Sequence, residues 1–278
     1  MSSNSIKNEL TKEGIISEIK LLLSADINKK QSVVIVEGDD DIKLLRKFLQ
    51  NDVHINESFS GKGGVEEIVS FFYDKRVIGI RDKDYDEISN NKIFIYDYSC
   101  LEMMIISYKN IFESMYYEYY NGTLSYEEFF CVVLNGIKRM SLLRKINSEE
   151  KYEIKLKGIS ISNIIDENYI CLERLMEEVV KRNKDKFQVD FIETLKDRIL
   201  NEEEKDYNID ELLHITQGHD FIDNFKINCR KNSGREPSKD DVASSLRCLF
   251  NDSHFKTTKL YNSLNEYESL VNLNITKK

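Results

Sequence analysis

Residues 77–86 read VIGIRDKDYD, and the fold expected for this chain follows from this stretch. The short, β-branched apolar run over 77–80 is typical of a buried strand, and Asp82, Asp84 and Asp86 follow it at alternate positions. Open α/β sheets bind their ligands at the carboxyl ends of the strands. If the backbone stays extended, the three aspartates point to one side, where their charges repel unless a cation lies between them. The pattern therefore predicts a site for Mg²⁺ or Mn²⁺.

The same acidic stretch has other interpretations. Acidic clusters after strands are often solvated turns, and this alternative stays open. A calcium-binding EF-hand loop that starts at Asp82 is excluded, because the required glycine and glutamate positions hold Glu87 and Ile93. Phosphatases of the haloacid dehalogenase type also place Asp-x-Asp after a strand, with the first aspartate as nucleophile. Their motif usually continues with Thr or Val where Asp86 stands, so a phosphatase is the weaker alternative.

The composition indicates a globular protein with enough apolar material for a core: 278 residues, 41% hydrophobic and 32% charged, with a net charge of −9. This acidity argues against a general nucleic-acid coat protein, but not against an enzyme with a local basic patch. No apolar run approaches the roughly 20 residues of a membrane helix, and the polar start MSSNSIKNEL predicts no export signal. The five cysteines form no CxxC pair, so we expect reduced thiols, no zinc site and a cytoplasmic location.

A second strand tip lies earlier in the chain. The run SVVIV over 32–36 predicts a buried strand, which ends at Glu37 and Gly38. The aspartates at 39–41 favour the N-terminal dipole of a following helix, which explains at least two of them structurally. Glu37 has no such explanation, and the glycine after it lets the backbone turn or a ligand approach closely.

A glycine-rich turn follows the next expected strand, at 53–59. Residues 61–64 read GKGG and precede a helix expected over 65–72. Such a turn with Lys62 suits a phosphate group, although the Walker A spacing is absent and a plain tight turn is the alternative.

Glu102 lies in a helix expected over 100–106, after a short strand at 92–95. It is either the capping-box partner of Ser99 or a metal ligand, direct or indirect. Both interpretations stay open.

The elements define the fold class. A helix is expected over 6–24, and strands alternate with helices over 32–107, which predicts an α/β domain with a mainly parallel sheet flanked by helices. From residue 108 the pattern is helical. We therefore predict an α/β domain over 1–107 and a mostly α-helical domain over 108–278. The helices expected in the second domain are 108–120, 126–144, 171–184, 187–200, 209–215, 221–229, 242–250 and 259–271, with 145–165 as the least regular connection.

The helical part contributes two features with a conceivable function. Gly218, His219 and Asp220 open a helix, and His219 has the chemistry to act as acid, base or hydrogen-bond donor at a phosphate, although a capping or packing histidine is the more frequent case. A run of basic residues is usually a solvated face, and in a nuclease it would hold the substrate backbone. Its members are Lys226, Arg230, Lys231, Arg235 and Lys239.

Together, the strand tips VVIVEGDDD and VIGIRDKD resemble the Toprim domain of topoisomerases, bacterial primases and OLD-family nucleases, over residues 32–107. With DKDYD, YSCLEMM and GHDFI included, the chain looks closest to the subgroup that contains the Toprim subunit of PARIS anti-phage defence systems. The resemblance implies a Mg²⁺-dependent endonuclease that acts as a toxic effector, cleaves RNA, especially tRNA, or DNA, and is controlled by an ABC-type ATPase partner. A homodimer is compatible with it, and a Toprim module that only binds is the alternative.

The resemblance also implies roles for individual residues. Glu37 matches the family's general acid/base, which also contacts metal, and Asp82 and Asp84 match its metal-binding pair. Further acidic residues at matching positions, expected to bind metal, are Asp41, Asp86 and Glu102. From their own chemistry, and not from the resemblance, we expect Lys62, Lys83 and His219 to assist catalysis.

Overall fold

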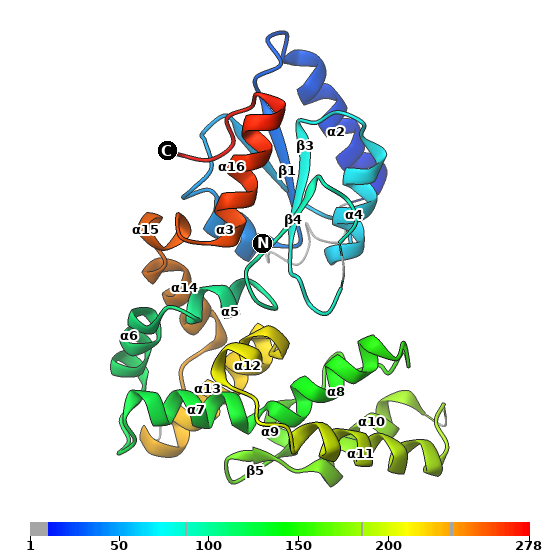
Figure 1. Ribbon diagram of the computed structural model, residues 1–278, viewed down its shortest axis with the longest axis vertical. Coiled ribbons are helices and arrows are strands. Elements are labelled where there is room, and N and C mark those ends of the chain that lie inside the picture. Colours follow the sequence, from blue (N-terminus) through cyan, green and yellow to red (C-terminus); the bar gives the residue numbers. More distant parts are fainter. Residues whose placement is uncertain (1–10, 87, 185, 234–235) are drawn as a thin grey trace, which may run out of the picture. The chain divides into compact units, whose positions relative to one another are not determined.

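The computed structural model describes residues 11–86, 88–184, 186–233 and 236–278. They form two compact units (Figure 1). The first unit takes its described residues from Met1–Lys83, Glu87–Asp97 and Phe250–Lys278, and the second consists of Asp84–Asp86 and Tyr98–Leu249. None of the described helices is both long and apolar enough to cross a lipid bilayer.

The first unit is built on a four-stranded sheet in the order β2-β1-β3-β4, in which every neighbouring pair is parallel. The two central strands are buried along their whole lengths, as parallel strands covered on both faces usually are. The predicted α/β class with a mainly parallel sheet is confirmed. The strands are β1 (Ser32–Val36), β2 (Val53–Glu57), β3 (Val77–Arg81) and β4 (Ile93–Ile95).

Helices cover both faces of this sheet (Figure 1). Val33 of β1 and Ile93 of β4 pack in one apolar cluster with α2 and α4. Phe94, the next residue of β4, contacts Tyr267 of α16, with ring centroids 5.4 Å apart. Because successive strand residues point to opposite faces, α16 lies across the sheet from α2 and α4. The helices are α2 (Lys12–Ala25), α3 (Asp39–Leu45), α4 (Gly61–Phe71), α15 (Asp252–Phe255) and α16 (Lys259–Val271). Of the helix expected over 6–24, residues 6–10 lie outside the described residues.

The C-terminal segment belongs to the α/β unit. Thr276 forms an antiparallel bridge with Leu49, and the buried carboxylate of Glu268 accepts the N–H groups of Ile275 and Thr276. The structure thus divides the chain differently from the predicted 1–107 and 108–278 boundaries. The reason is that α16 must bury an apolar face, which includes Leu264, and the sheet provides the partner.

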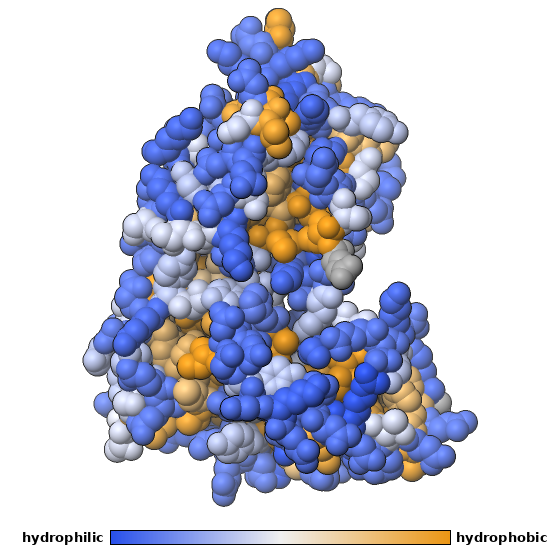
Figure 2. All heavy atoms as spheres, in the orientation of Figure 1, coloured by the Kyte–Doolittle hydropathy of each residue, from blue (hydrophilic) through white to orange (hydrophobic). Residues whose placement is uncertain are grey.

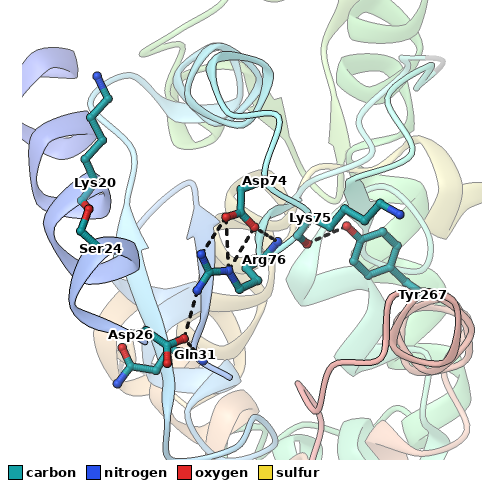
Figure 3. Close-up of polar contacts among 8 residues, drawn as sticks. All are labelled: Lys20, Ser24, Asp26, Gln31, Asp74, Lys75, Arg76 and Tyr267. Carbon is teal, nitrogen blue, oxygen red and sulfur yellow. Dashed lines mark hydrogen bonds and ion pairs between the residues drawn. The ribbon is translucent and has the colours of Figure 1, made fainter. Parts of the chain in front are cut away.

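An ion-pair network holds the N-terminal edge of the sheet (Figure 3). Arg76, which is 8% exposed, pairs with Asp26 at 3.0 Å and with Asp74 at 2.8 Å. Asp26 also accepts the N–H of Gln31 at 2.7 Å. The network therefore ties the end of α2 to the starts of β1 and β3.

Hydrophilic and hydrophobic side chains both lie on the surface of the first unit (Figure 2). The hydrophobic ones gather beside α16. A groove of about 810 Å³ lies there, and Tyr73 and Leu270 line it with 99% and 82% of their surface exposed.

The second unit is almost entirely helical, as predicted. Its aromatic core includes Phe112, Phe129 and Phe225, which are buried and in ring contact. The helix expected over 126–144 is instead two helices, which meet at the non-helical residue Ile137. Gly136, the last residue of the first helix, lies close to a neighbouring segment: a Cβ atom there would lie 2.5 Å from the Asn168 carbonyl oxygen. The elements are α5 (Leu101–Ile106), α6 (Lys109–Tyr119), α7 (Tyr126–Gly136), α8 (Lys138–Glu149), α9 (Ile161–Ile164), β5 (Ile165–Asp166), β6 (Tyr169–Ile170), α10 (Leu172–Asn183), α11 (Val189–Glu203), α12 (Ile209–Ile215), α13 (Gly218–Ser233) and α14 (Lys239–Leu249).

Candidate functional site

The carboxyl ends of β1 and β3 bring Glu37 and Asp82 together. The two strands are parallel neighbours, with Val33 opposite Val77, so the residues that follow them reach the same edge of the sheet. Glu37 Oε1 accepts a hydrogen bond of 2.9 Å from the backbone N–H of Asp82. Both side chains are half-buried. The meeting of the two strand tips, which the sequence predicts, is thus present in the first unit.

Asp41 is hydrogen-bonded through both of its carboxylate oxygens. Oδ2 accepts the Gly38 N–H at 2.9 Å, and Oδ1 accepts the Tyr96 hydroxyl at 2.7 Å. Asp41 is 8% exposed and lies in the first turn of α3. It therefore braces the turn after β1, and its predicted role as a metal ligand stays a prediction.

Tyr96 is a site residue that the sequence reasoning missed. Its side chain is 1% exposed, and burial raises the pKa of its phenol well above the ordinary value. The negative charges of Asp41, Asp82 and Glu37 raise this pKa further, as smaller contributions. The phenol thus marks the place where these carboxylates gather. The available signal was a tyrosine directly after the apolar strand at 93–95.

The glycine-rich turn lies against Glu37. Gly61 begins α4 with φ +47°, and a Cβ atom at this position would lie 3.6 Å from Glu37 Oε2. The helix therefore starts earlier than predicted and includes the glycines. Lys62 and Lys83 are half-buried, and their predicted contact with phosphate stays a prediction.

Arg81 is a second residue that the sequence reasoning passed over. Its Nη1 donates to the carbonyl oxygen of Asp82 at 2.6 Å, and its Nη2 pairs with Glu66 at 2.9 Å. The side chain is 1% exposed. A charged residue at the end of a buried strand is easily taken for a surface residue, which is why its position gave no signal.

Asp84 adopts a conformation that the sequence reasoning did not anticipate. β3 ends at Arg81, and Asp84 has a left-handed backbone with φ +48°, so the assumption of a continuous extended chain through Asp86 is wrong. Within the second unit, the Asp84 N–H donates to the Ser99 carbonyl at 2.8 Å, and its Oδ1 accepts from Gln217 Nε2 at 3.2 Å. The sequence did not indicate that Gln217 binds Asp84, the residue predicted to be a metal ligand. Asp86 is half-buried, and its role stays a prediction.

Tyr85, between these aspartates, anchors the loop. Its hydroxyl donates to the Ile215 carbonyl at 2.6 Å, and burial raises the pKa of its phenol far above the ordinary value. The segment Asp84–Asp86 is therefore attached to the C-terminal end of α12.

Glu102 packs against the start of α13. A Cβ atom at Gly218 would lie 2.1 Å from Glu102 Oε2, so the Glu102 side chain would have to move to admit any other residue there. The capping-box interpretation of Glu102 is wrong, because α5 begins after Cys100 with no side-chain cap, while the Ser99 hydroxyl donates to the Thr216 carbonyl. Its role as a metal ligand stays a prediction.

His219 lies in the first turn of α13 beside a buried ion pair. Asp220 is 1% exposed, and both of its oxygens accept from Arg144, at 2.7 and 3.2 Å. His219 Nε2 lies 3.2 Å from Arg144 Nη2 and 3.2 Å from Asp220 Oδ1, while 58% of its side chain is exposed. Arg144 and Asp220 therefore orient the His219 ring, while most of its side chain stays accessible to solvent.

The predicted basic cluster is largely neutralised by neighbouring acids. Lys226 and Arg230 pair with Glu236, at 3.2 and 3.4 Å, and Lys239 pairs with Asp223 at 2.7 Å. Burial lowers the pKa of Lys231. Arg235 lies outside the described residues. This arrangement favours the solvated-face interpretation over a strip for the substrate backbone.

The chemistry of the donors suits a hard cation. In the described part of the chain, no group of three or more His, Cys, Asp or Glu is arranged to hold a metal ion. Mg²⁺, however, usually binds through one or two carboxylates, several waters and substrate phosphates, without a complete protein cage. Glu37 and Asp82 fit that kind of site.

No protein-family model matches this chain, and no curated protein matches it. The class that fold and site define is therefore an α/β protein with an acidic strand-tip site and an added helical unit.

Proposed function

We propose that this chain is a metal-dependent nuclease of the Toprim type, which hydrolyses phosphodiester bonds in nucleic acid. The observation that carries the proposal is the 2.9 Å hydrogen bond from the Asp82 N–H to Glu37 Oε1. It joins the glutamate of one strand tip to the first aspartate of the other, and these two motifs carry the Toprim resemblance. The carboxyl edge of a parallel sheet is also where α/β proteins bind ligands.

Mg²⁺ or Mn²⁺ would be held by Glu37 and Asp82, with Asp84 next along the chain. Only Lys83 separates Asp82 from Asp84, so chain geometry alone keeps their Cα atoms within about 7 Å. When bound, the cation activates water and offsets negative charge on the phosphate. Glu37 would exchange a proton at Oε2, the oxygen directed toward Gly61.

The remaining predicted residues have supporting roles in this proposal. Lys62 and Lys83 supply positive charge to the substrate phosphate, and His219 exchanges a proton or donates a hydrogen bond. Asp86 and Glu102 are additional acidic ligands, direct or through water.

The sequence resemblance supports the choice of substrate and setting. RNA, and tRNA in particular, is favoured over DNA. The protein would act in the cytoplasm as the toxic effector of an anti-phage system, restrained and triggered by an ABC-type ATPase.

A cleavage assay tests the nuclease directly. Purified protein is incubated with Mg²⁺ or Mn²⁺ and end-labelled tRNA, other RNA or DNA, with and without EDTA. We expect metal-dependent cleavage that Glu37→Gln and Asp82→Asn each slow by about 10⁴-fold, or about 5 kcal/mol of barrier. Asp39→Asn is the matched control, because this carboxylate near the same strand tip is exposed and paired with Lys43. Equal rates for the wild type and Glu37→Gln would refute the proposal.

A binding module without catalysis is the second candidate. Such a module would bind tRNA without cutting it, even with the ATPase partner added. Inducible expression in cells separates the two: a nuclease arrests growth and loses toxicity with Glu37→Ala, whereas a binding module shows no such difference.

The phosphatase alternative is tested with the same variants. A phosphatase would hydrolyse a small phosphoester such as para-nitrophenyl phosphate, and Glu37→Gln would leave that activity intact.

A further inference from the structure

The backbone of Asp82 is held on both sides of its Cα atom within the first unit, because the peptide units before and after it each make a side-chain hydrogen bond. Its N–H donates to Glu37 Oε1 at 2.9 Å, and its carbonyl oxygen accepts from Arg81 Nη1 at 2.6 Å. The other end of the guanidinium, Nη2, pairs with Glu66 at 2.9 Å. The backbone of Asp82 therefore has little freedom to rotate.

Arg81 is an unusual residue for its position. The four residues before it in β3 are apolar or glycine and buried, and Arg81 itself is 1% exposed. Burying a guanidinium carries a large desolvation cost unless its donors are satisfied by good partners. Its planar fork donates in fixed directions, so it can serve the Asp82 carbonyl and Glu66 together, which a lysine ammonium on a flexible chain does less well.

We propose that Arg81 is a positioning residue of the acidic site, which orients Asp82 by fixing the peptide unit that follows it, while Glu37 holds the one before it. The inference rests on the proposed function, in which the Asp82 carboxylate binds a divalent cation. Arg81 acts through Asp82 and is not assigned a contact with substrate. Groups that orient metal ligands in this way typically change metal affinity by about 10–100-fold.

The native protein provides a first test that needs no variant. If Glu37 holds the Asp82 N–H, hydrogen exchange of this amide, followed by NMR, is slowed by at least about 100-fold relative to an unprotected amide. Exchange at the unprotected rate would overturn the arrangement on which the inference depends.

Variants then test Arg81 itself. Arg81→Met removes the donor to the Asp82 carbonyl, Arg81→Lys keeps the charge without the fork, and Glu66→Gln is the matched control that leaves the Arg81–Asp82 bond in place. We expect Arg81→Met to speed Asp82 amide exchange and to weaken Mn²⁺ binding, each by about tenfold or more. Arg81→Lys gives a smaller loss, and Glu66→Gln stays within about twofold of the wild type.

The outcomes separate this inference from the proposed function. A folded Arg81→Met or Arg81→Lys protein with unchanged Asp82 exchange overturns the positioning role. If the wild type binds no Mn²⁺, the proposed function fails, and the exchange measurement still decides whether Arg81 holds Asp82. If Arg81→Met does not fold, Arg81→Lys decides. If neither variant folds while Glu66→Gln does, Arg81 serves the folding of the strand and the positioning role is rejected.

Discussion

The hydroxyl of Tyr96 donates a 2.7 Å hydrogen bond to Oδ1 of Asp41, across 55 positions of sequence. The pair joins the residue after the edge strand β4 to the first turn of α3, the helix that follows the central strand β1. Asp41 in turn holds the Gly38 N–H next to Glu37. A buried phenol thus supports the strand tip from which the proposed acid/base residue projects.

Tyr96→Phe is expected to reduce the free energy of unfolding by about 1–3 kcal/mol, because it leaves a buried carboxylate oxygen without its O–H donor. Tyr73→Phe is the control, since Tyr73 is 99% exposed and should change stability by less than about 0.5 kcal/mol. Urea unfolding of both variants measures the difference. Equal stabilities would show that the Tyr96–Asp41 bond contributes nothing net.

Gly218→Ala is expected to destabilise the second unit by about 1–3 kcal/mol, because the new methyl group would overlap the Glu102 carboxylate. Gly63→Ala is the matched control: a Cβ atom there meets nothing within 4 Å, and alanine favours a helix. Thermal unfolding of both variants, each with and without Glu102→Ala, measures the energetic coupling between the glycine substitution and the Glu102 side chain. The overlap predicts that Glu102→Ala rescues part of the Gly218→Ala loss, and fully additive effects would contradict it.

Asp220→Asn is expected to cost about 3–5 kcal/mol of stability, because it leaves the Arg144 guanidinium without its buried carboxylate partner. Asp223→Asn serves for comparison: it breaks the more exposed pair with Lys239 and should cost at most about 1 kcal/mol. Both values come from denaturant unfolding. Similar losses for the two variants would mean that burial of the Arg144–Asp220 pair has no energetic consequence.

His219→Ala separates structural from functional roles. With 58% of the side chain exposed, its loss should change stability by less than about 0.5 kcal/mol. If His219 exchanges a proton at the phosphate, cleavage should slow by about 10²–10⁴-fold. Parallel unfolding and cleavage assays distinguish the cases, and an unaltered cleavage rate would remove His219 from the proposed mechanism.

The Asp74–Arg76 pair at the N-terminal edge of the sheet predicts acid sensitivity (Figure 3). The hydrogen bond from Arg76 holds the pKa of Asp74 below its ordinary value. A lowered pKa in the folded state adds stability above the pKa of the unfolded chain, near 4, and this stability is lost as the pH falls through the folded value. Because Asp74 is partly exposed, we expect less than about 1 kcal/mol.

We therefore measure the free energy of unfolding at pH 7 and at pH 3. Between these two pH values it should fall more for the wild type than for Asp74→Asn. Asp52→Asn, at an exposed carboxylate, should retain the wild-type slope. If the free energy of unfolding of Asp74→Asn falls as much as that of the wild type between pH 7 and pH 3, other groups cause the acid sensitivity.

The sequence by itself determined the α/β class, the strands at 32–36 and 77–80 and the helical character of the second unit. Each of these follows from local periodicity: β-branched runs form buried strands, and apolar residues at helical spacing form amphipathic helices. It also placed Glu37 and Asp82 at neighbouring strand tips, because parallel strands end at the same edge.

Only the tertiary structure decided which partners these residues have. Gln217 reaches Asp84 across 133 positions, and the C-terminal α16 returns to the sheet rather than joining the helical unit. The buried Arg81 and Tyr96 were overlooked for the same reason. Hydrogen bonds between distant segments depend on three-dimensional proximity and side-chain direction, and no local sequence pattern encodes either.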